Sequence, residues 1–313
     1  MARAHGSNTQ MLGKFETGYG TTPTGNFHKL PFVSTTLGAE QGLIADDTLG
    51  NGRDPNAPGR DVVKCDGDVV VPLDARNIGH WLKGLLGAPV STGTDPNHVH
   101  TFISGVSTLP SLSLEIGLPE VPSYAMIAGV AVDKMALKMA TSGNASATFS
   151  CIGQGETRTG SSNGGTPTTE VYTRFSQFQG SVKKGGTSLG NVVSADITFA
   201  NNLDAVRVIR DDGKIEGADP GKCALTGNIV VRFSDTALLT AARNGTPIDL
   251  EFAYTIDADT SLVIQAPAVY LPKPKTPING PGGIEATFAW QAARQDDGGP
   301  MMTVILSNDV ASY

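Results

Sequence analysis

The chain contains GDVVVPLDARNIGHWLKGLLG at residues 67–87 and GNIVVRFSDTALLTAARNG at residues 227–245, two stretches that follow one plan. Each starts with a glycine and a valine-rich apolar run, which predicts a buried β-strand. Each then passes through polar residues into apolar residues at helical spacing. Each stops at a glycine, the residue that helices favour just past their C-terminal end. Gly67 and Gly227 are 160 positions apart, so the sequence indicates a repeated strand–helix unit.

Two further pairs of segments support an internal duplication. GRDP at 52–55 matches GADP at 217–220, and ATFSCIGQ at 147–154 matches ATFAWQAA at 286–293. The pairs occur in the same order in both halves, as expected for repeated units. The offset falls from 160 to 139 because the first half carries extra residues around 91–110.

The rest of the pattern is typical of strands and turns. Only two stretches have helical periodicity, 74–86 and 235–244, with Asp74 and Ser234 as the expected N-caps. Alternating apolar and polar residues or short apolar runs predict strands elsewhere. These are 67–72, 99–104, 111–116, 124–139, 145–152, 196–199, 227–233, 248–254, 262–270, 284–290 and 302–306. We therefore predict a mainly β protein with two tandem sandwich or barrel domains, each with a flanking α-helix.

The duplication places the domain boundaries. We predict one domain at 1–156, a linker rich in glycine and threonine at 157–169, and a second domain at 170–313. Each domain carries a long polar loop, at 40–62 and at 203–222. Loops of about 20 residues are uncommon inside compact domains and are usually functional.

Composition excludes several classes of protein. The 313 residues include 38 glycines and 19 prolines, and only 17% are charged, which disfavours a helical bundle. The net charge of −7 is spread over both halves and argues against a phosphate-binding patch for nucleic acid. No apolar run is long enough to cross a membrane. Three cysteines without a C-x-x-C motif indicate a reducing, cytosolic place of synthesis.

No motif predicts a catalytic centre. Ser181 and Lys184 fit S-x-x-K, but no helical pattern surrounds them. GQGETRTG at 153–160 lacks the Gly-Lys-Ser/Thr end of a phosphate loop. His98 and His100 share a strand face without a third metal ligand nearby in sequence. We therefore predict no enzyme activity, no metal and no cofactor.

Several segments resemble the tail tube proteins of long-tailed bacteriophages, in particular the larger members of that family. They are FETGYGTTPTGNFHKLPFVSTTLGAEQ, GNGRDPNAP, DGDVVVPLD, LGNVVSADITFANNLD, IRDDGKIEGADP and FAYT. The resemblance extends from about Phe15 to Val310, and its specificity lies in the order of the segments.

The resemblance implies a structural virion protein that forms stacked rings, and hence a tail tube through which the genome reaches the host. It implies a β-sandwich subunit whose inner sheet joins those of its neighbours, with a long loop reaching the adjacent ring. The implied partners are other copies of the chain and the tail-tip and tail-terminator proteins. The tape-measure protein and DNA would occupy the lumen without specific binding, and no membrane is involved. The protein would be made in the host cytoplasm and reside in the phage tail.

The two long loops are then the expected inter-ring contacts. Their charged residues are Asp46, Asp47, Arg53, Asp54, Arg210, Asp211, Asp212 and Lys214. The alternative for these residues is that they are ordinary solvated loop charges. Because one chain carries two domains, we expect a trimeric ring with pseudo-six-fold symmetry rather than a hexamer.

Two other functions remain as alternatives. A tail-tip or capsid-decoration protein would use similar sandwiches without forming an extended tube. A carbohydrate-binding or hydrolytic β-protein would need exposed aromatic clusters or paired carboxylates in a cleft, whereas aromatic residues make up only 6% of the chain.

Overall fold

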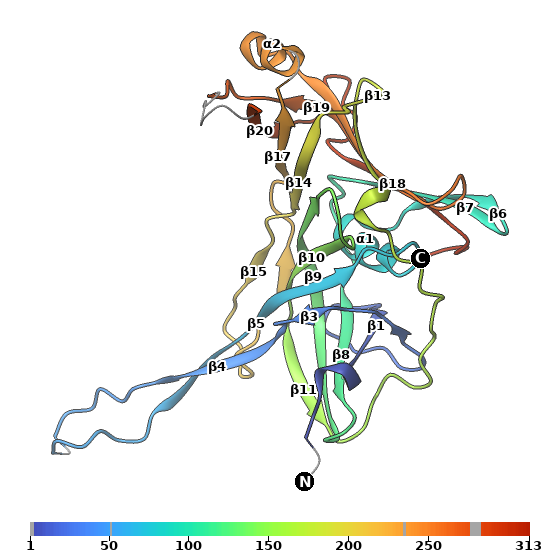
Figure 1. Ribbon diagram of the computed structural model, residues 1–313. Coiled ribbons are helices and arrows are strands. Elements are labelled where there is room, and N and C mark those ends of the chain that lie inside the picture. The colour runs from blue at the N-terminus through green and yellow to red at the C-terminus, as the bar shows by residue number, and fades with distance from the viewer. Residues whose placement is uncertain (1–2, 51, 234–235, 276–282) are drawn as a thin grey trace.

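The computed structural model describes residues 3–50, 52–233, 236–275 and 283–313 (Figure 1). As predicted, the protein is mainly β. The described residues contain two α-helices, α1 (Ile78–Leu86) and α2 (Ala237–Asn244), and two 3-10 turns, η1 (Gly6–Asn8) and η2 (Gln177–Gln179). The described strands form large antiparallel sheets rather than a closed barrel.

A central sheet runs through both halves of the chain. Its order is β3 and β4 beside β5, then β10, β9, β14, β17 and β20. The bounds are β3 (Ser34–Thr35), β4 (Gly38–Ile44), β5 (Gly59–Pro72), β9 (Ser123–Met139), β10 (Ser146–Ile152), β14 (Val192–Ala200), β17 (Ala224–Arg232) and β20 (Glu285–Ala292). The halves meet where β9 pairs with β14, from Met139 opposite Ala195 to Lys134 opposite Ala200.

Each half has a second sheet packed over the central one. In the first half its order is β2 (His28–Lys29), β1 (Gln10–Phe15), β8 (Leu112–Leu118), the first part of β9, and β11 (Gly155–Thr159). Over the second half its order is β13 (Thr187–Ser188), β12 (Gly180–Lys184), β18 (Ile248–Thr255), β19 (Ser261–Tyr270), β21 (Thr303–Asn308), β7 (Asn97–Ile103) and β6 (Val90–Thr94). The last two strands come from the first half of the chain and extend the sheet of the second. A small separate pair is β15 (Asp204–Val206) with β16 (Gly217–Asp219).

The core lies between these layers. One face of the central sheet is buried, with Phe149 and Phe288 fully enclosed. Trp81 of α1 stacks on Phe149 with ring centroids 5.1 Å apart, and Trp290 stacks on Phe252 at 5.7 Å. Burial of these aromatic rings removes a large apolar area from water in both halves.

Both predicted helices are present, but α1 starts later than expected. It begins at Ile78, and Asp74 does not cap it. Instead, the Asp74 carboxylate accepts hydrogen bonds from the backbone N–H groups of Arg76 and Asn77, in the turn before the helix. α2 begins at Ala237, and its expected cap Ser234 lies outside the described residues. Gly245 ends α2 with φ of 63°, a left-handed conformation that favours glycine.

The expected loop at 40–62 is largely a β-hairpin. β4 pairs with β5 out to Ile44 opposite Gly59. Most of the hairpin residues beyond the sheet are exposed on both faces, so no apolar alternation marks them as strands. The expected linker also has structure: its first three residues continue β11, and Gly164 O accepts a hydrogen bond from Phe27 N at 2.9 Å.

The two halves share their strand registers. Val69 lies opposite Phe149 in the first half, and Ile229 lies opposite Phe288 in the second. Ile229 is 160 positions after Val69, and Phe288 is 139 positions after Phe149. Both β8–β9 and β18–β19 contain a register shift at the same place, between Leu112 and Leu114 and between Ile248 and Leu250. These offsets agree with those of the sequence repeats.

The two protruding hairpins also share their register. Ile44 lies opposite Gly59 in the first, and Asp204 lies opposite Asp219 in the second, an offset of 160 in both strands. GRDP and GADP, which are 165 positions apart, therefore lie five positions out of step. The equivalence of the hairpins rests on strand pairing and not on that sequence match.

Candidate assembly interfaces

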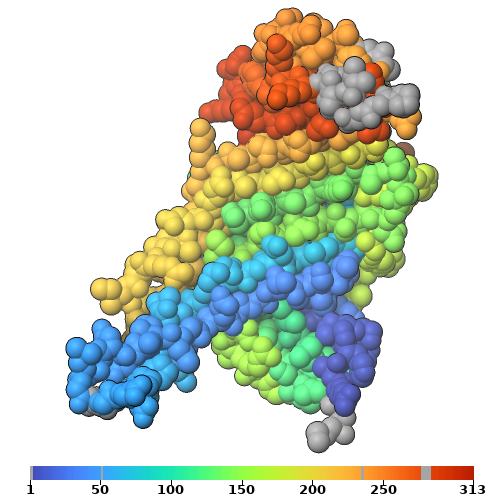
Figure 2. Space-filling model, turned by 60° about the vertical axis from the view of Figure 1, so that its left-hand side comes forward, coloured from blue at the N-terminus to red at the C-terminus, as the bar shows by residue number. Residues whose placement is uncertain are grey.

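Two hairpin arms project from the central sheet. Arm 1 comprises residues 38–66 and arm 2 comprises residues 198–226, and each is bounded by a paired position of the sheet. Arm 1 extends away from the body of the molecule (Figure 1), and arm 2 lies beside its base (Figure 2). Val63 N donates a hydrogen bond to Gly213 O at 3.0 Å. Arm 2, which belongs to the second half, is therefore seated on the first half.

The side chain of Lys214 completes this seat. Its Cε lies 2.8 Å from the point where a Cβ on Gly155 would stand, so the lysine side chain packs directly over this glycine. The other predicted charges of arm 2, Arg210, Asp211 and Asp212, line a shallow pocket with Arg60 and Val62 of arm 1. Arg210 pairs with Asp212 at 2.8 Å within arm 2 itself, and this hydrogen-bonded partner lowers the pKa of Asp212.

The predicted charges of arm 1 lie elsewhere, near its exposed tip. Asp46 accepts hydrogen bonds from Thr48 and Asn56, which lower the pKa of Asp46. Asp47, Arg53 and Asp54 make no ion pair with any residue that the structure describes. The structure thus places the predicted charged residues of arm 2 against the base of arm 1, but it does not bring them together with the predicted charged residues of arm 1.

Each arm also exposes a large apolar side chain that the sequence interpretation missed. Leu49 is 93% exposed and Ile209 is 106% exposed, relative to the reference state. These residues are 160 positions apart, so they hold equivalent positions near the two tips. No periodic pattern surrounds them, and only the repeat offset relates one to the other. Single exposed apolar residues are common on protein surfaces, so it is the repetition at equivalent positions that makes Leu49 and Ile209 candidates for a contact.

The central sheet has an open edge at each end. At one end, β3 and β4 pair in register with β5 alone. At the other end, within the described residues, β20 pairs with β17 along its length but meets β19 only at Val269–Ala292 and Tyr270–Gln291. Pro272 and Pro274 follow, and because proline has no N–H donor they prevent β19 from continuing along β20.

The face of the central sheet that points away from the core is polar and built from small residues. Paired positions such as Thr148, Thr198 and Thr226 lie on it. Its charged residues are of both signs: Asp66, Asp68, Asp196 and Glu285, with Lys134, Lys138 and Arg232. A sheet with one buried face and one solvated face has this composition.

Residues 6–292 match the model of a protein family described as phage tail tube protein. The chain belongs to this family. It is therefore a structural component of a phage tail, as the sequence resemblance implied. A comparison with curated proteins gave no match. Among the described residues of this tail tube protein, no group of His, Cys, Asp and Glu is arranged to hold a metal ion, and no helix is long and apolar enough to span a membrane.

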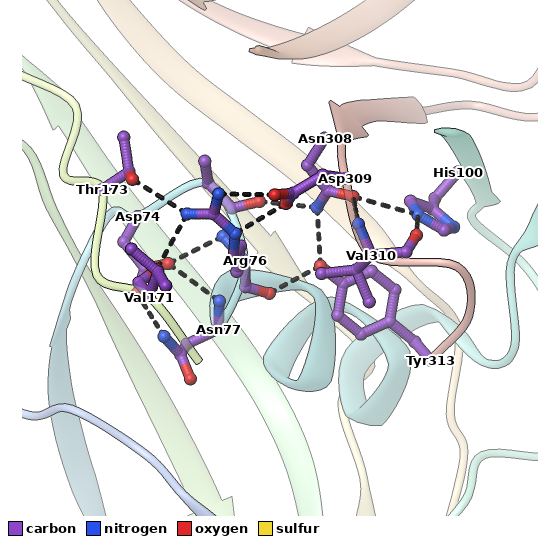
Figure 3. A network of polar contacts seen from close by, with 11 residues as sticks. Asp74, Arg76, Asn77, His100, Val171, Thr173, Asn308, Asp309, Val310 and Tyr313 are labelled. Atoms are coloured by element: carbon purple, nitrogen blue, oxygen red, sulfur yellow. Dashed lines mark hydrogen bonds and ion pairs between the residues drawn. The ribbon is translucent and has the colours of Figure 1, made fainter. Parts of the chain in front are cut away.

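The C-terminal segment of the tail tube protein clamps the second half onto the first (Figure 3). The Arg76 guanidinium donates two hydrogen bonds to the Asp309 carboxylate, at 2.6 and 2.7 Å. It donates two more to Val171 O and Thr173 Oγ1, both at 2.9 Å. Tyr313 OH donates to Arg76 O at 2.6 Å. The clamp thus ties the chain end to the turn before α1.

We expect Asp309→Asn to lower the free energy of unfolding by about 1 kcal/mol, because a two-bond ion pair becomes a neutral contact and Asp309 is half-exposed. Hydrogen bonding from Arg76 keeps the pKa of Asp309 below its usual value, so the pair is intact at neutral pH. Urea unfolding at pH 7 measures the change. Asp259→Asn, at an exposed turn, is the matched control, and equal losses in both variants would contradict a role for the ion pair.

Proposed function

We propose that this protein forms closed rings that stack into the phage tail tube, the conduit through which the genome enters the host. The observation that carries the proposal is the β9–β14 junction, where two units with matching strand registers join edge to edge inside one chain. The open edges of the central sheet can repeat that junction between chains. Ring closure removes exposed sheet edges, which otherwise promote uncontrolled association.

We infer that the chain is a tandem duplication of one tail tube unit. The units are 1–156 and 170–313, joined by residues 157–169. Matching registers in the central sheet, the outer sheets and the arms support this division. Three chains then supply six units, so we propose a trimeric ring with pseudo-six-fold symmetry.

The register of the internal junction specifies the proposed junction between chains. Within the chain, Lys134 of β9 lies opposite Ala200 of β14. The equivalent of Lys134, 139 positions later, is Lys273, and the equivalent of Ala200, 160 positions earlier, is Glu40. The segment after β19 of one copy would thus lie beside β4 of the next, with opposite charges facing each other.

The polar face of the central sheet then lines the lumen. Its small hydroxyl side chains and mixed charges provide no continuous basic surface that would bind DNA phosphates. DNA and the tape-measure protein would move through such a lumen without specific binding. Tail-tip and tail-terminator proteins would cover the ends of the stack, and assembly would follow synthesis in the host cytoplasm.

Electron microscopy of the purified chain at high concentration tests the ring. We expect rings with a central hole, three chains per ring by mass, and six similar densities around the hole. Six chains per ring would contradict the pseudo-six-fold arrangement. Rings that never stack would favour the alternative of a tail-tip or capsid-decoration protein.

We also propose that the arm tips mediate stacking. We expect the double variant Leu49→Asp and Ile209→Asp to form single rings but no tubes, because each exposed apolar contact would be replaced by a carboxylate that must be desolvated. The distribution of single rings and stacks in electron micrographs measures the effect. The control is Thr48→Asp with Arg207→Asp, which places a carboxylate close to each tip residue without removing an exposed apolar side chain. Equal loss of stacking in both double variants would show that added charge alone is responsible.

A further inference from the structure

We propose that a groove in the second half of the chain is the docking site for arm 1 of the neighbouring copy within the same ring, with Asp54 of the arm facing Arg294 of the groove. This inference rests on the proposed ring. The groove, here called the β17 groove, has a volume of about 1160 Å³. It is lined by Val106, Lys222, Cys223, Leu225, Arg294 and Met301, among other residues.

The β17 groove is the equivalent of the seat that arm 2 occupies on the first half. That seat is formed by Val63 and Gly155. At the repeat offsets their equivalents are Cys223 and Arg294, and both line the groove. The alignment holds up to the strand positions just before the seat, because Ile152 lies opposite Asp66 just as Gln291 lies opposite Thr226.

Backbone hydrogen bonding leaves a matching donor in the groove. In the occupied seat, Val63 N donates to Gly213 O of arm 2. The equivalent N–H, on Cys223, has no backbone acceptor in the described part of the chain. In the proposed complex its partner is the carbonyl of Arg53, the equivalent of Gly213. A docked arm would therefore supply a backbone acceptor for this donor.

Charge complementarity selects arm 1 as the occupant. The β17 groove carries the cations Lys222 and Arg294. Asp54 of arm 1 corresponds to Lys214 of arm 2, so arm 1 has a carboxylate where arm 2 has an ammonium group. On the receiving surface, Arg294 corresponds to Gly155, so the groove has a guanidinium where the occupied seat has no side chain. Arg294 already donates to Gly298 O through Nε and Nη2, which holds the guanidinium in place. An Asp54–Arg294 pair would hold the two chains in one register.

The direction of the arms agrees with this placement. Arm 2 leaves the central sheet at β14, the strand that pairs with the first half, and it docks on that half. Arm 1 leaves at β4, the open edge where the preceding copy would join, and it extends away from the body of its own chain (Figure 1). Because Ile209 remains exposed although arm 2 is seated, Leu49 would also remain exposed after arm 1 docks. Docking within a ring and stacking between rings thus use different residues of one arm.

Cross-linking between two singly substituted chains tests the contact. One chain carries Asp54→Cys and the other carries Arg294→Cys, both in a Cys223→Ser background, and they are mixed before assembly. Since each chain has one half of the pair, any 54–294 link joins two copies. We expect a short bismaleimide to link residues 54 and 294 in assembled protein, and mass spectrometry identifies the peptide. Asp259→Cys in place of Asp54→Cys is the matched control and should give no link.

A charge exchange tests the energetics. We expect Asp54→Arg or Arg294→Glu to raise the protein concentration at half-assembly about tenfold, and the double variant to recover most of that loss. The docking proposal would be overturned if the wild-type chain forms rings but residues 54 and 294 cannot be linked and the double variant does not recover assembly. The proposed ring would still stand in that case. Absence of rings from the wild-type chain at every concentration would instead overturn the proposed function, and the docking proposal with it.

Discussion

The Ala39→Pro variant is expected to fold but to form no rings. Ala39 lies on β4, at the open edge of the central sheet, opposite Cys65 of β5. Its N–H points away from β5 and donates to the Glu156 carboxylate at 3.2 Å. A proline ring at this position therefore leaves the pairing of β4 with β5 intact and blocks the side on which a neighbouring chain would pair.

The loss of assembly should be near complete, because one blocked edge per chain interrupts every junction of a closed ring. The folded monomer should lose only about 1 kcal/mol, the typical net contribution of one hydrogen bond. Mass measurement in solution gives the fraction of assembled chains, and urea unfolding gives the stability. Ala39→Ser, which keeps the N–H group, is the matched control and should assemble normally. If Ala39→Pro forms rings in the same yield as the wild type, this edge takes no part in the junction.

The repeated strand–helix unit could be predicted from sequence because it is buried. Valine-rich runs and helical apolar stripes record the contacts of a core, so residues 67–87 and 227–245 carried the offset that the strand registers reproduce. The strand expected at 124–139 lies within one residue of β9. Burial constrains residue type on every second position, and this constraint is visible in one sequence.

The arms were harder to predict because solvent imposes no such pattern. The β4 strand is exposed along most of its length, and its residues alternate neither in polarity nor in size. The short match between GRDP and GADP suggested an offset of 165, which aligns Gly52 with Gly217 and hides the relation of Asp54 to Lys214. Only the pairing of Ile44 with Gly59, repeated by Asp204 with Asp219, restores the offset of 160.

The charged residues of the arms lie in protruding segments, but their partners were not predictable. Arg210 and Asp212 pair with each other, two positions apart, and so neutralise charges that were expected to pair between rings. Lys214 reaches a glycine in another part of the chain. Contacts of this kind depend on how two units join at β9 and β14, a long-range pairing with no local sequence signal.

Acidification should destabilise the protein through a cluster of buried and partly buried histidines. His80 is only 9% exposed, and its ring lies 4.5 Å from the His28 ring and 5.2 Å from the Tyr313 ring. Burial lowers the pKa of His80 to about 3, with smaller contributions from His28 and Lys83. Burial also lowers the pKa values of His28 and His100.

The sign of the effect follows from proton binding. Between pH 6.5 and about 3 the unfolded chain binds a proton at His80 that the folded chain does not bind, so stability falls as pH falls. Each pH unit in this window costs about 1.4 kcal/mol for one such group. Above pH 6.5 both states leave His80 neutral, and its contribution no longer changes.

The variant His80→Leu isolates this contribution. We expect its free energy of unfolding to fall less steeply between pH 6 and 4 than that of the wild type, by about 1.4 kcal/mol per pH unit, because one proton uptake on unfolding is removed. The comparison uses slopes from urea unfolding, since loss of the ring contacts also changes stability at pH 7. Tyr313→Phe, which alters the same ring cluster without removing an imidazole, is the control. Equal slopes for His80→Leu and the wild type would show that His80 takes up no proton on unfolding, and the clamp built around Tyr313 would then owe its acid sensitivity to other groups.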